Sequence, residues 1–337
     1  MNSNKPTLSG FFKSVERRIE SLTEDGDTSF QVRVGSQVIE QRFTSVKNAQ
    51  TVARFMVGII QERKEDPDAV FYYWNEDCSH YLPADAKDKG AVWQSRDDTG
   101  YMRLSDGYNM VGMDYERNRF YFCRHPSKAT EYMLYGHAMV LTFGQWAARN
   151  GMLLLHSACV GVNGKGVMIS ARGGEGKSTL AVSCLLGGFD FVADDALLVN
   201  QEGPLKAMPI YRTVGLNQDM NRLLKPDMPV VYVDPKRNDK LLLDASRFKF
   251  KEQLPVHAIL YPRVTDASVP SIKKIGSGAV LAKLIDSTAT LIGVFRDPEL
   301  YRLMAQRLLG VPVYEIMLTN DLVLNREFLK KYIMEEL

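Results

Sequence analysis

Residues 161–195 read GVNGKGVMISARGGEGKSTLAVSCLLGGFDFVADD, and this stretch decides the fold of the 337-residue chain. Within it, Ala171–Ser178 is a glycine-rich loop of the G-x-x-x-x-G-K-[ST] type, with alanine at the first position. The loop follows an apolar strand, Val167–Ile169, and precedes a segment with apolar residues at helical spacing. In this context the motif predicts a phosphate-binding loop, because glycine backbone N–H groups can close around an anion and a helix N-terminus attracts it.

The loop supplies the predicted nucleotide-binding residues, which are Gly173, Gly174, Glu175, Gly176, Lys177, Ser178 and Thr179. The Lys177 ammonium would reach the β- and γ-phosphates, and the Ser178 hydroxyl would bind Mg²⁺. We therefore expect ATP and Mg²⁺ as ligands, with the identity of the purine open. The side chains of Arg172 and Glu175 are expected to face solvent, with contact between Arg172 and a phosphate as the alternative.

A hairpin is predicted directly before the loop. Asn163-Gly164 lies between two alternating apolar segments, and this dipeptide favours the type I′ turn that joins antiparallel strands. The strand that leads into the loop is therefore expected to pair antiparallel with the strand before it. Ras-like and kinase-like P-loop folds reach the same strand through a parallel crossover instead, so we expect a mixed sheet.

Two adjacent carboxylates, Asp194 and Asp195, follow the predicted strand Phe189–Ala193. Consecutive residues at a strand end point to opposite faces, so the two side chains are expected to differ in function. We predict that Asp194 binds the metal together with Ser178, and that Asp195 is the general base for an acceptor hydroxyl. The alternative is a metal site without a base, as an ATPase would use.

A family resemblance is carried by three elements: His156 before the hairpin, the ARGGEGKS loop, and Phe191–Asp195. Together they resemble the bacterial HPr kinase/phosphorylase family, whose core is shared with phosphoenolpyruvate carboxykinases. The resemblance implies an α/β fold, with an HPr-kinase/carboxykinase-like P-loop core, a mixed sheet and an N-terminal α+β accessory domain. It also implies that His156 lies beside Asp195 and orients it; a buried core imidazole is the alternative for His156.

The segment Pro209–Gly215 resembles the family's Glu-x-Arg-Gly-x-Gly motif. Arg212 then matches the family arginine and would stabilise charge on the transferred phosphoryl group, with a solvated surface arginine as the alternative. Ile210 replaces the acidic residue, which favours a kinase without phosphorylase activity. Arg263 is a second candidate phosphate or acceptor ligand, whereas residues 235–240 are expected to form a solvated charged loop.

Composition limits the partners of the chain. A net charge of +2 and the lack of a basic block with interleaved aromatic residues argue against nucleic acid. The four cysteines have no C-x-x-C spacing, which indicates neither zinc nor a disulfide framework. No signal peptide and no run of 18 apolar residues is found, so a cytoplasmic location without a membrane partner is expected. A homo-oligomer is compatible with the sequence.

Three regions are expected along the chain: an N-terminal α+β accessory domain at residues 1–125, a linking helix within 126–150, and the kinase domain at 151–337. The N-terminal region is predicted to hold a helix, a hairpin around Gly35-Ser36, a second helix over Val46–Arg63 and several aromatic strands. The Tyr72–Trp74 cluster is expected to pack in a sheet, with ligand stacking as the alternative. The linking helix is predicted over Lys128–Arg149. Strands are predicted at Val70–Trp74, Val92–Ser95, Tyr101–Leu104, Asn109–Asp114, Arg119–Arg124, His257–Arg263 and Pro312–Met317. C-terminal helices are predicted at Ala279–Ile285, Ser287–Val294, Pro298–Leu309 and Leu324–Glu336.

The predicted function is an ATP-dependent kinase that transfers the γ-phosphoryl group to a serine-type hydroxyl on a protein, peptide or small molecule. HPr itself is a doubtful acceptor, because the C-terminal segment and N-terminal domain of the members that phosphorylate it are not found in this sequence. The competing hypothesis is a regulatory nucleotide-binding or ATPase module without phosphotransfer. A carboxykinase is disfavoured because lysine and histidine metal ligands at a suitable spacing are not evident.

Overall fold

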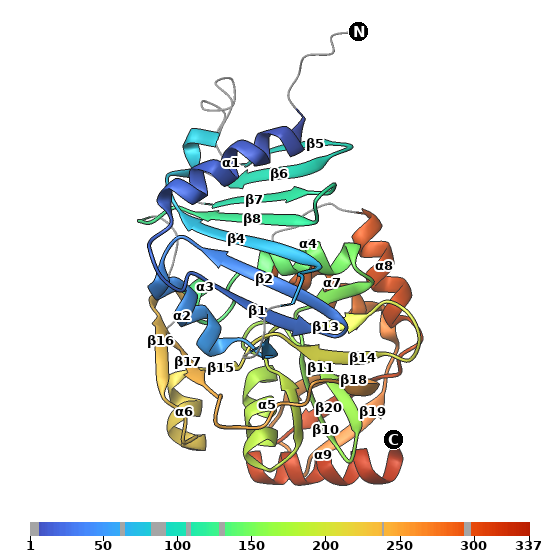
Figure 1. Ribbon diagram of the computed structural model, residues 1–337. Helices are drawn as coiled ribbons and strands as arrows, with labels where there is room; N and C mark the ends of the chain where they lie inside the picture. The colour runs from blue at the N-terminus through green and yellow to red at the C-terminus, as the bar shows by residue number, and fades with distance from the viewer. Residues whose placement is uncertain are drawn as a thin grey trace. The chain divides into compact units, whose positions relative to one another are not determined.

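The computed structural model describes residues 7–60, 65–81, 92–105, 109–127, 132–237, 239–292 and 298–337. The chain divides into two compact units, Met1–Leu134 and Tyr135–Leu337, and both combine helices with β-sheet (Figure 1). The division falls inside the segment that was expected to link two domains.

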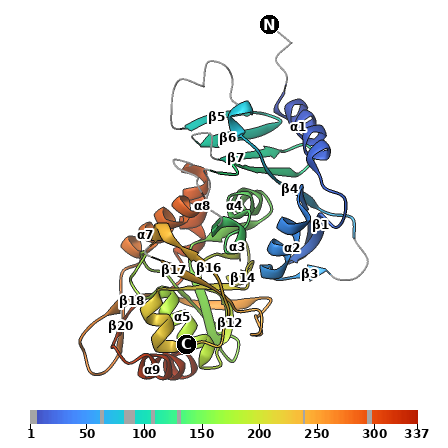
Figure 2. The same ribbon diagram turned by 90° about the vertical axis from the view of Figure 1, so that its left-hand side faces the viewer.

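The N-terminal unit contains an eight-stranded mixed sheet in the order β3-β1-β2-β4-β8-β7-β6-β5. The strand β4 pairs in parallel with β2 and β8, and the remaining pairs are antiparallel. Figure 2 shows the helix α1 alongside β6 and β7, and α2 alongside β1. The bounds are α1 Leu8–Leu22, β1 Ser29–Val34, β2 Gln37–Phe43, α2 Val46–Phe55, β3 Ile59–Ile60, β4 Ala69–Asn75, the 3-10 turn Cys78–Tyr81, β5 Val92–Asp97, β6 Gly100–Ser105, β7 Asn109–Asp114 and β8 Arg119–Arg124.

The aromatic strand β4 belongs to the core of this unit, as predicted. Tyr72, Tyr73 and Trp74 are all buried, and the Tyr72 ring stacks on that of Tyr121 with centroids 5.2 Å apart. On the other side of Tyr121, the Phe12 ring of α1 stacks at 4.4 Å. These rings pack against one another, so the sheet-packing interpretation of the cluster is confirmed.

The second helix is shorter than predicted. The prediction of one helix over Val46–Arg63 was wrong, because α2 ends at Phe55 and Ile59–Ile60 form the strand β3 on β1. Gly58 explains the change: its φ of +74° lies in the left-handed region, and its carbonyl accepts a hydrogen bond from the Arg33 N–H at 2.8 Å. Residues 61–64 lie outside the described part of the chain.

The C-terminal unit contains a nine-stranded mixed sheet and a separate three-stranded sheet in the order β15-β17-β16. The central path of the larger sheet runs β12-β10-β11-β18-β14-β13-β9, and β20 pairs with both β18 and β19. The bounds of the strands are β9 Met152–Leu155, β10 Ala158–Val162, β11 Lys165–Ile169, β12 Asp190–Ala193, β13 Leu197–Asn200, β14 Lys206–Pro209, β15 Thr213–Leu216, β16 Val230–Asp234, β17 Lys240–Asp244, β18 Leu254–Val264, β19 Ser271–Lys274 and β20 Val313–Leu318.

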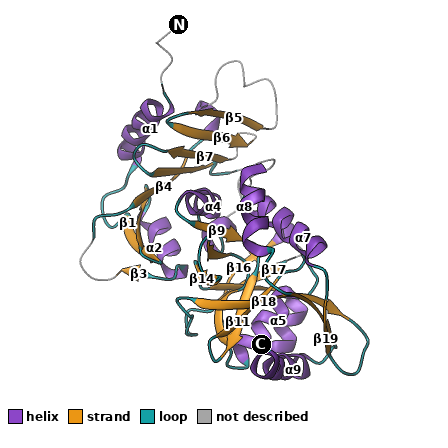
Figure 3. Cartoon of the chain, turned by 90° about the vertical axis from the view of Figure 1, so that its right-hand side faces the viewer, coloured by secondary structure: helices purple, strands orange, loops and turns teal. Residues whose placement is uncertain are grey.

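The helices of this unit pack in pairs as well as on the sheet. Figure 3 shows α7 beside α8, and α5 beside α9. The prediction of two helices over Ala279–Ile285 and Ser287–Val294 was wrong, because α7 continues through Asp286 and ends at Leu291. The bounds are α3 Tyr132–Tyr135, α4 Val140–Arg149, α5 Lys177–Leu186, α6 Gln218–Leu224, the 3-10 turn Pro235–Arg237, α7 Ser277–Leu291, α8 Pro298–Leu308 and α9 Leu322–Glu336.

The hairpin predicted from Asn163-Gly164 is confirmed. β10 and β11 pair antiparallel, with Ala158 opposite Ile169 and Val162 opposite Lys165. Both turn residues have positive φ, +51° at Asn163 and +79° at Gly164, as a type I′ turn requires. β11 also pairs in parallel with β18, so the sheet is mixed as expected.

The predicted linking helix is interrupted. Instead of one helix over Lys128–Arg149, the structure describes α3 and α4, with a break at residues 136–139 and nothing described for 128–131. Met139 has a φ of +57°, which a helix interior does not allow. The break is stabilised from outside, because the buried Tyr211 hydroxyl donates a hydrogen bond to the Ala138 carbonyl at 2.6 Å. The sequence around Ala138 gives no information about Tyr211, which lies far along the chain.

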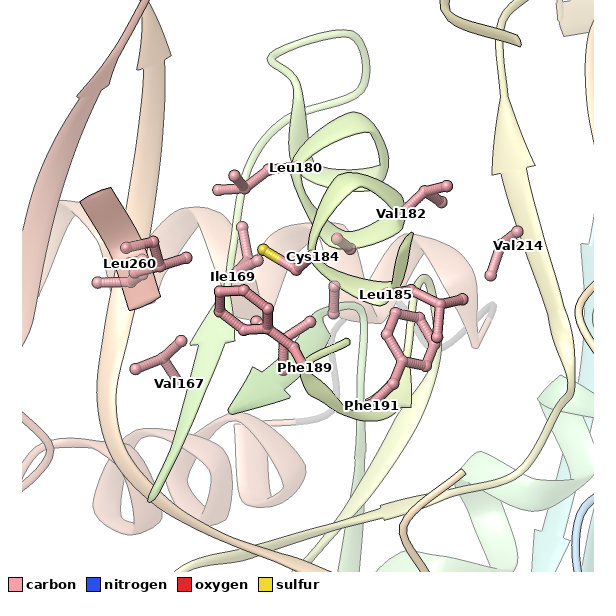
Figure 4. Close-up of a cluster of buried hydrophobic side chains, with 14 of the residues drawn as sticks. Val167, Ile169, Leu180, Val182, Cys184, Leu185, Phe189, Phe191, Val214 and Leu260 are labelled. Atoms are coloured by element: carbon pink, nitrogen blue, oxygen red, sulfur yellow. The ribbon is translucent and has the colours of Figure 1, made fainter. Parts of the chain in front are cut away.

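The helix α5 is anchored by a hydrophobic core. Leu180 and Cys184 are among the buried side chains of α5 that pack in one cluster with Ile169 of β11 and Phe191 of β12 (Figure 4). Fully burying an aliphatic or aromatic side chain stabilises a fold by about 1.5–3 kcal/mol. The glycine-rich loop is therefore held at both ends, by a central strand before it and a buried helix after it.

Candidate functional site

The loop between β11 and α5 has the backbone of an anion-binding turn. Gly174 and Gly176 have φ values of +89° and +95°, where a side chain would be strained. A methyl group added at Gly173 or Gly174 would meet nothing within 4 Å, so the loop presents open space on that side. The helix α5 begins at Lys177, and its N-terminal amides and dipole favour negative charge at this position.

A pocket of about 290 Å³ lies against the loop. It is bounded on one side by the loop and the first turn of α5, and on the other by the small sheet and the start of α6. Both adjacent aspartates were expected here, but only Asp195 lines the pocket. The lining residues are His156, Arg172, Gly173, Gly174, Gly176, Lys177, Ser178, Thr179, Asp195, Gly215, Leu216, Asn217 and Lys240.

Asp195 is the centre of a charge cluster. Its Oδ1 accepts a hydrogen bond from the Lys177 ammonium and lies 3.0 Å from His156 Nε2. Its Oδ2 lies 3.5 Å from His137 Nε2 and 3.8 Å from Lys240 Nζ. Burial raises the pKa of this carboxyl, but the charges of Lys177 and Lys240 and the contact with His156 outweigh it and hold the pKa well below its usual range. Asp195 is therefore ionised.

Asp194 does not line the pocket. Its side chain is fully buried, and its Oδ2 accepts a hydrogen bond from the Gly215 N–H at 2.8 Å. The Oδ1 has no hydrogen-bond partner among the described residues and lies 3.8 Å from Lys177 Nζ. The Asp194 carbonyl also accepts a hydrogen bond from Lys177, at 2.8 Å. The two neighbouring carboxylates thus have different surroundings but share one lysine.

His156 follows β9 and is held from two sides. Its backbone N–H donates a hydrogen bond at 2.9 Å to the hydroxyl of Thr288, a buried residue of α7. Its Nε2 contacts Asp195, whereas its Nδ1 is buried and has no hydrogen-bond partner among the described residues. The imidazole lines the pocket as well as contacting Asp195, so it does not simply fill the core.

Glu175 was expected to face solvent, but its side chain is held by two hydrogen bonds. Its Oε2 accepts hydrogen bonds from the Arg172 N–H at 2.7 Å and from the Tyr261 hydroxyl at 2.8 Å. Lys283 of α7 donates in turn to the Tyr261 oxygen at 2.9 Å and lies over its ring. These contacts tie the first half of the glycine-rich loop to β18 and α7, because Tyr261 belongs to one and Lys283 to the other.

The two candidate arginines are not part of the pocket wall. Arg212 has a buried Nε without a hydrogen-bond partner among the described residues, and its carbonyl accepts from the Ala245 N–H at 2.9 Å. Arg263, at the end of β18, is 65% exposed and lies 3.7 Å from Glu315. Ile210, where the resemblance implied an acidic residue, is buried. The structure therefore does not bring either arginine to Asp195.

Three polar residues of the site were missed in the sequence: His137, Asn217 and Lys240. His137 lies in the break between α3 and α4, where a continuous helix was predicted. Lys240 was assigned to a solvated charged loop, but it is the first residue of β17, and its side chain is only 20% exposed. The local sequence gives no signal for either position, because both reach Asp195 through long-range pairing and packing.

Ser178 and Asp194 are the side chains of this site that could bind Mg²⁺. No group of three or more His, Cys, Asp or Glu side chains arranged for a metal ion is found among the described residues. Mg²⁺ does not need such a cage, since it is usually bound by one or two carboxylates together with water and substrate phosphates. Ser178 on the pocket wall and the unpartnered Oδ1 of the buried Asp194 fit that limited role.

Comparisons with known proteins gave structural matches but no sequence match. No family model matches the chain, and no curated protein matches its sequence. Among solved structures, the HPr(Ser) kinase/phosphatase from Coxiella burnetii is similar to 54% of this chain and 97% of its own, at 14% identity and a TM-score of 0.31. Among the described residues, no helix is both long and apolar enough to span a membrane. The chain's own helices and mixed sheets make it a mixed α/β protein.

Proposed function

We propose that this protein is a phosphotransferase that moves the γ-phosphoryl group of ATP to a hydroxyl acceptor. One observation carries the proposal: the N-terminus of α5, the Lys177 ammonium and the ionised Asp195 line a single pocket. The first two attract phosphate, and the third accepts a hydrogen bond from a hydroxyl. Phosphoryl transfer requires mainly this combination of charge stabilisation and positioning.

In the proposed complex the loop Gly173–Gly176 donates backbone N–H groups to phosphate oxygens. Lys177 exchanges its contact with Asp195 for the β- and γ-phosphates, a short movement since both lie at the same pocket wall. Mg²⁺ would supply neutralisation of the phosphate oxygens, held by Ser178 and Asp194. Thr179, the next residue of α5, completes the phosphate side.

Asp195 then orients the acceptor hydroxyl. The acceptor oxygen bonds to the γ-phosphorus, the bond from that phosphorus to the bridging oxygen breaks, and the electron pair leaves with ADP. The acceptor proton passes to Asp195. Loss of the Lys177 contact raises the proton affinity of this carboxylate, which makes it a better base once nucleotide is bound. His156 holds the carboxylate in place through Oδ1.

The proposal includes the HPr-kinase-like core architecture inferred from the motifs, with an accessory role for the N-terminal unit. It also includes forward transfer without phosphorolysis. In support, Ile210 is buried and apolar where the family carries a carboxylate, and Arg212 does not line the pocket. A serine-type hydroxyl on a protein, peptide or small molecule remains the proposed acceptor class.

The first experiment measures nucleotide binding and phosphate transfer together. Mg²⁺-ATP should raise the melting temperature of the wild-type protein, because ligand at 100 times Kd stabilises the native state by about 2.7 kcal/mol. Lys177→Met should lose most of this shift. Lys249→Met, which removes the same charge from an exposed position, should keep it.

Transfer is then followed with γ-labelled ATP and an extract of the host cell. The wild type should label an acceptor, and Lys177→Met should not. An unchanged melting temperature for the wild type in saturating Mg²⁺-ATP would exclude the nucleotide site. A normal shift without any labelled acceptor would favour the competing hypothesis, a nucleotide-regulated binding module.

A further inference from the structure

We propose that Lys240 binds the γ-phosphoryl group from the side opposite Lys177, so that the two lysines hold the transferred group between them. This inference rests on the proposed function and assigns a further catalytic residue to it. It also specifies the ligand class, since the second cation would make the pocket distinguish a nucleoside triphosphate from a diphosphate.

Strand pairing positions Lys240 at the pocket. Lys240 begins β17, and β17 pairs with β15 so that Leu241 lies opposite Leu216 and Leu242 opposite Gly215. This pairing brings the lysine to the pocket wall beside Gly215 and Leu216 of β15. The Lys240 ammonium lies 3.8 Å from Oδ2 of Asp195, whereas Lys177 contacts Oδ1. The two ammonium groups therefore approach the two oxygens of one carboxylate.

Gly215 makes this position accessible to the lysine. A methyl group added at Gly215 would lie 2.5 Å from Cε and 2.8 Å from Nζ of Lys240, so a side chain there would displace the ammonium. The Gly215 N–H also fixes Asp194 at 2.8 Å. One glycine thus gives space to the second lysine and holds the neighbouring carboxylate, which indicates that the lysine is directed to the pocket by its surroundings.

The two lysines differ in their ion pairs. Asp195 faces two ammonium groups and two imidazoles, and Asp194 lies 3.8 Å from Lys177. Lys177 thus has two carboxylates nearby, whereas among the described residues Lys240 pairs with Asp195 alone. At 3.8 Å the Lys240 pair is longer than a hydrogen bond. No hydrogen bond from its ammonium is found within the described residues. Three N–H donors are therefore left for an anionic ligand.

The geometry of transfer selects the γ-phosphoryl group as that ligand. The acceptor oxygen must approach both Asp195 and the γ-phosphorus, so a group within 4 Å of Asp195 lies near the transferred phosphoryl oxygens. Neither Arg212 nor Arg263 lines the pocket, and Arg172 belongs to the loop side. Lys240 is the cation placed to neutralise the phosphoryl group from the acceptor side.

Binding of two probes tests this assignment without activity. Calorimetry measures the affinity for Mg²⁺-ADP and for the non-hydrolysable ATP analogue adenylyl imidodiphosphate. Lys240→Met should weaken analogue binding by roughly 10- to 100-fold, the range for a hydrogen bond to a charged group. ADP binding should stay within about twofold, because Lys240 is assigned to the γ-phosphate alone. Lys240→Arg should retain part of the preference for the ATP analogue over ADP. Lys236→Met, at an exposed lysine four residues earlier, should retain all of that preference.

Transfer rate and a second variant complete the test. With an identified acceptor, Lys240→Met should lower kcat by roughly 10²–10³-fold, as does removal of one preorganised charge-stabilising donor. Gly215→Ala keeps the charge but moves the ammonium, and it should lose part of the same analogue affinity. In the Lys240→Met background, Gly215→Ala should then have little further effect on analogue affinity.

The outcomes separate this inference from the proposed function. A wild-type protein that binds neither nucleotide overturns both. Wild-type binding, with the same ratio of analogue to ADP affinity in Lys240→Met, overturns the assignment of Lys240 and leaves the proposed function standing. A variant that loses only affinity for the acceptor would place Lys240 on the acceptor instead, which also overturns the assignment.

Discussion

Replacing Asp195 by asparagine should destabilise the protein while strengthening its binding of nucleotide. The carboxylate is 11% exposed and is the common partner of Lys177 and Lys240. Without it, two ammonium groups remain close together in a largely buried site. Breaking a buried ion pair costs about 3–5 kcal/mol, and we expect the lower end because the pocket admits water. For a unit of this size, a loss of about 3 kcal/mol lowers the melting temperature by about 6–12 °C.

The affinity for nucleotide, unlike the stability, should increase in Asp195→Asn. In the ligand-free wild type, Lys177 must release Asp195 before it binds phosphate, and the carboxylate then repels the incoming anion. Two unit charges 4 Å apart interact by about 4 kcal/mol at an effective dielectric constant of 20, before desolvation is subtracted. We therefore expect Asp195→Asn to bind Mg²⁺-ATP about tenfold or more tightly. Transfer should nevertheless fall by roughly 10²-fold, the lower end for loss of a general base.

The assay combines thermal unfolding without ligand, nucleotide titration calorimetry and label transfer. Asp227→Asn is the matched control, because it removes one carboxylate from an exposed pair with Arg247 and should change stability by less than about 1 kcal/mol. The reasoning would be refuted if Asp195→Asn were as stable as the wild type and bound nucleotide no more tightly.

The pH dependence follows from the same cluster. Burial raises the pKa of Asp195, but Lys177, Lys240 and His156 lower it further, so the folded-state pKa is depressed. A depressed carboxyl pKa contributes stability above the unfolded value of about 3.9 and loses it as the pH falls towards the folded value. The difference in stability between the wild type and Asp195→Asn should accordingly shrink below about pH 4.

Two further predictions concern the supports of the site. Thr288→Val removes the acceptor of the part-buried His156 N–H and should lower the free energy of unfolding by about 1–3 kcal/mol in urea denaturation. Thr288→Ser, which keeps the acceptor, should cost about 1 kcal/mol, and equal losses would contradict the role of the hydrogen bond. Tyr261→Phe removes a hydrogen bond to Glu175 and should weaken nucleotide binding about fivefold in calorimetry by loosening the loop, at about 1 kcal/mol for the bond. Unchanged or tighter binding by Tyr261→Phe would show that the contact does not support the loop.

Much of the local structure was predictable from the sequence. The Asn163-Gly164 turn is specified by two adjacent residues that tolerate positive φ, and the alternating segments around it specify the paired strands. The glycine-rich loop depends likewise on its own glycines and on the strand and helix next to it. In the N-terminal unit, the strands β4 to β8 were predicted from short apolar runs and turn residues, because period-two patterns are local.

Longer helices were predicted less well. Val46–Arg63 and Lys128–Arg149 have helical spacing, yet the first ends at Phe55 and the second is broken before Val140. In both places a distant backbone or side chain offers a hydrogen bond that competes with the helix: Arg33 at Gly58, and Tyr211 at Ala138. Tertiary contacts override propensity at such points.

The sequence by itself therefore determined the phosphate-type loop, the hairpin before it and the pair of aspartates after it, since each is encoded within a few neighbouring residues. Only the tertiary structure decided which charges meet at Asp195. Lys240 reaches that carboxylate because β17 pairs with β15, and His137 because a helix breaks, whereas Arg212 and Arg263 lie elsewhere than on the pocket wall. Strand register and burial place residues that are far apart in the chain, and no local pattern records either one.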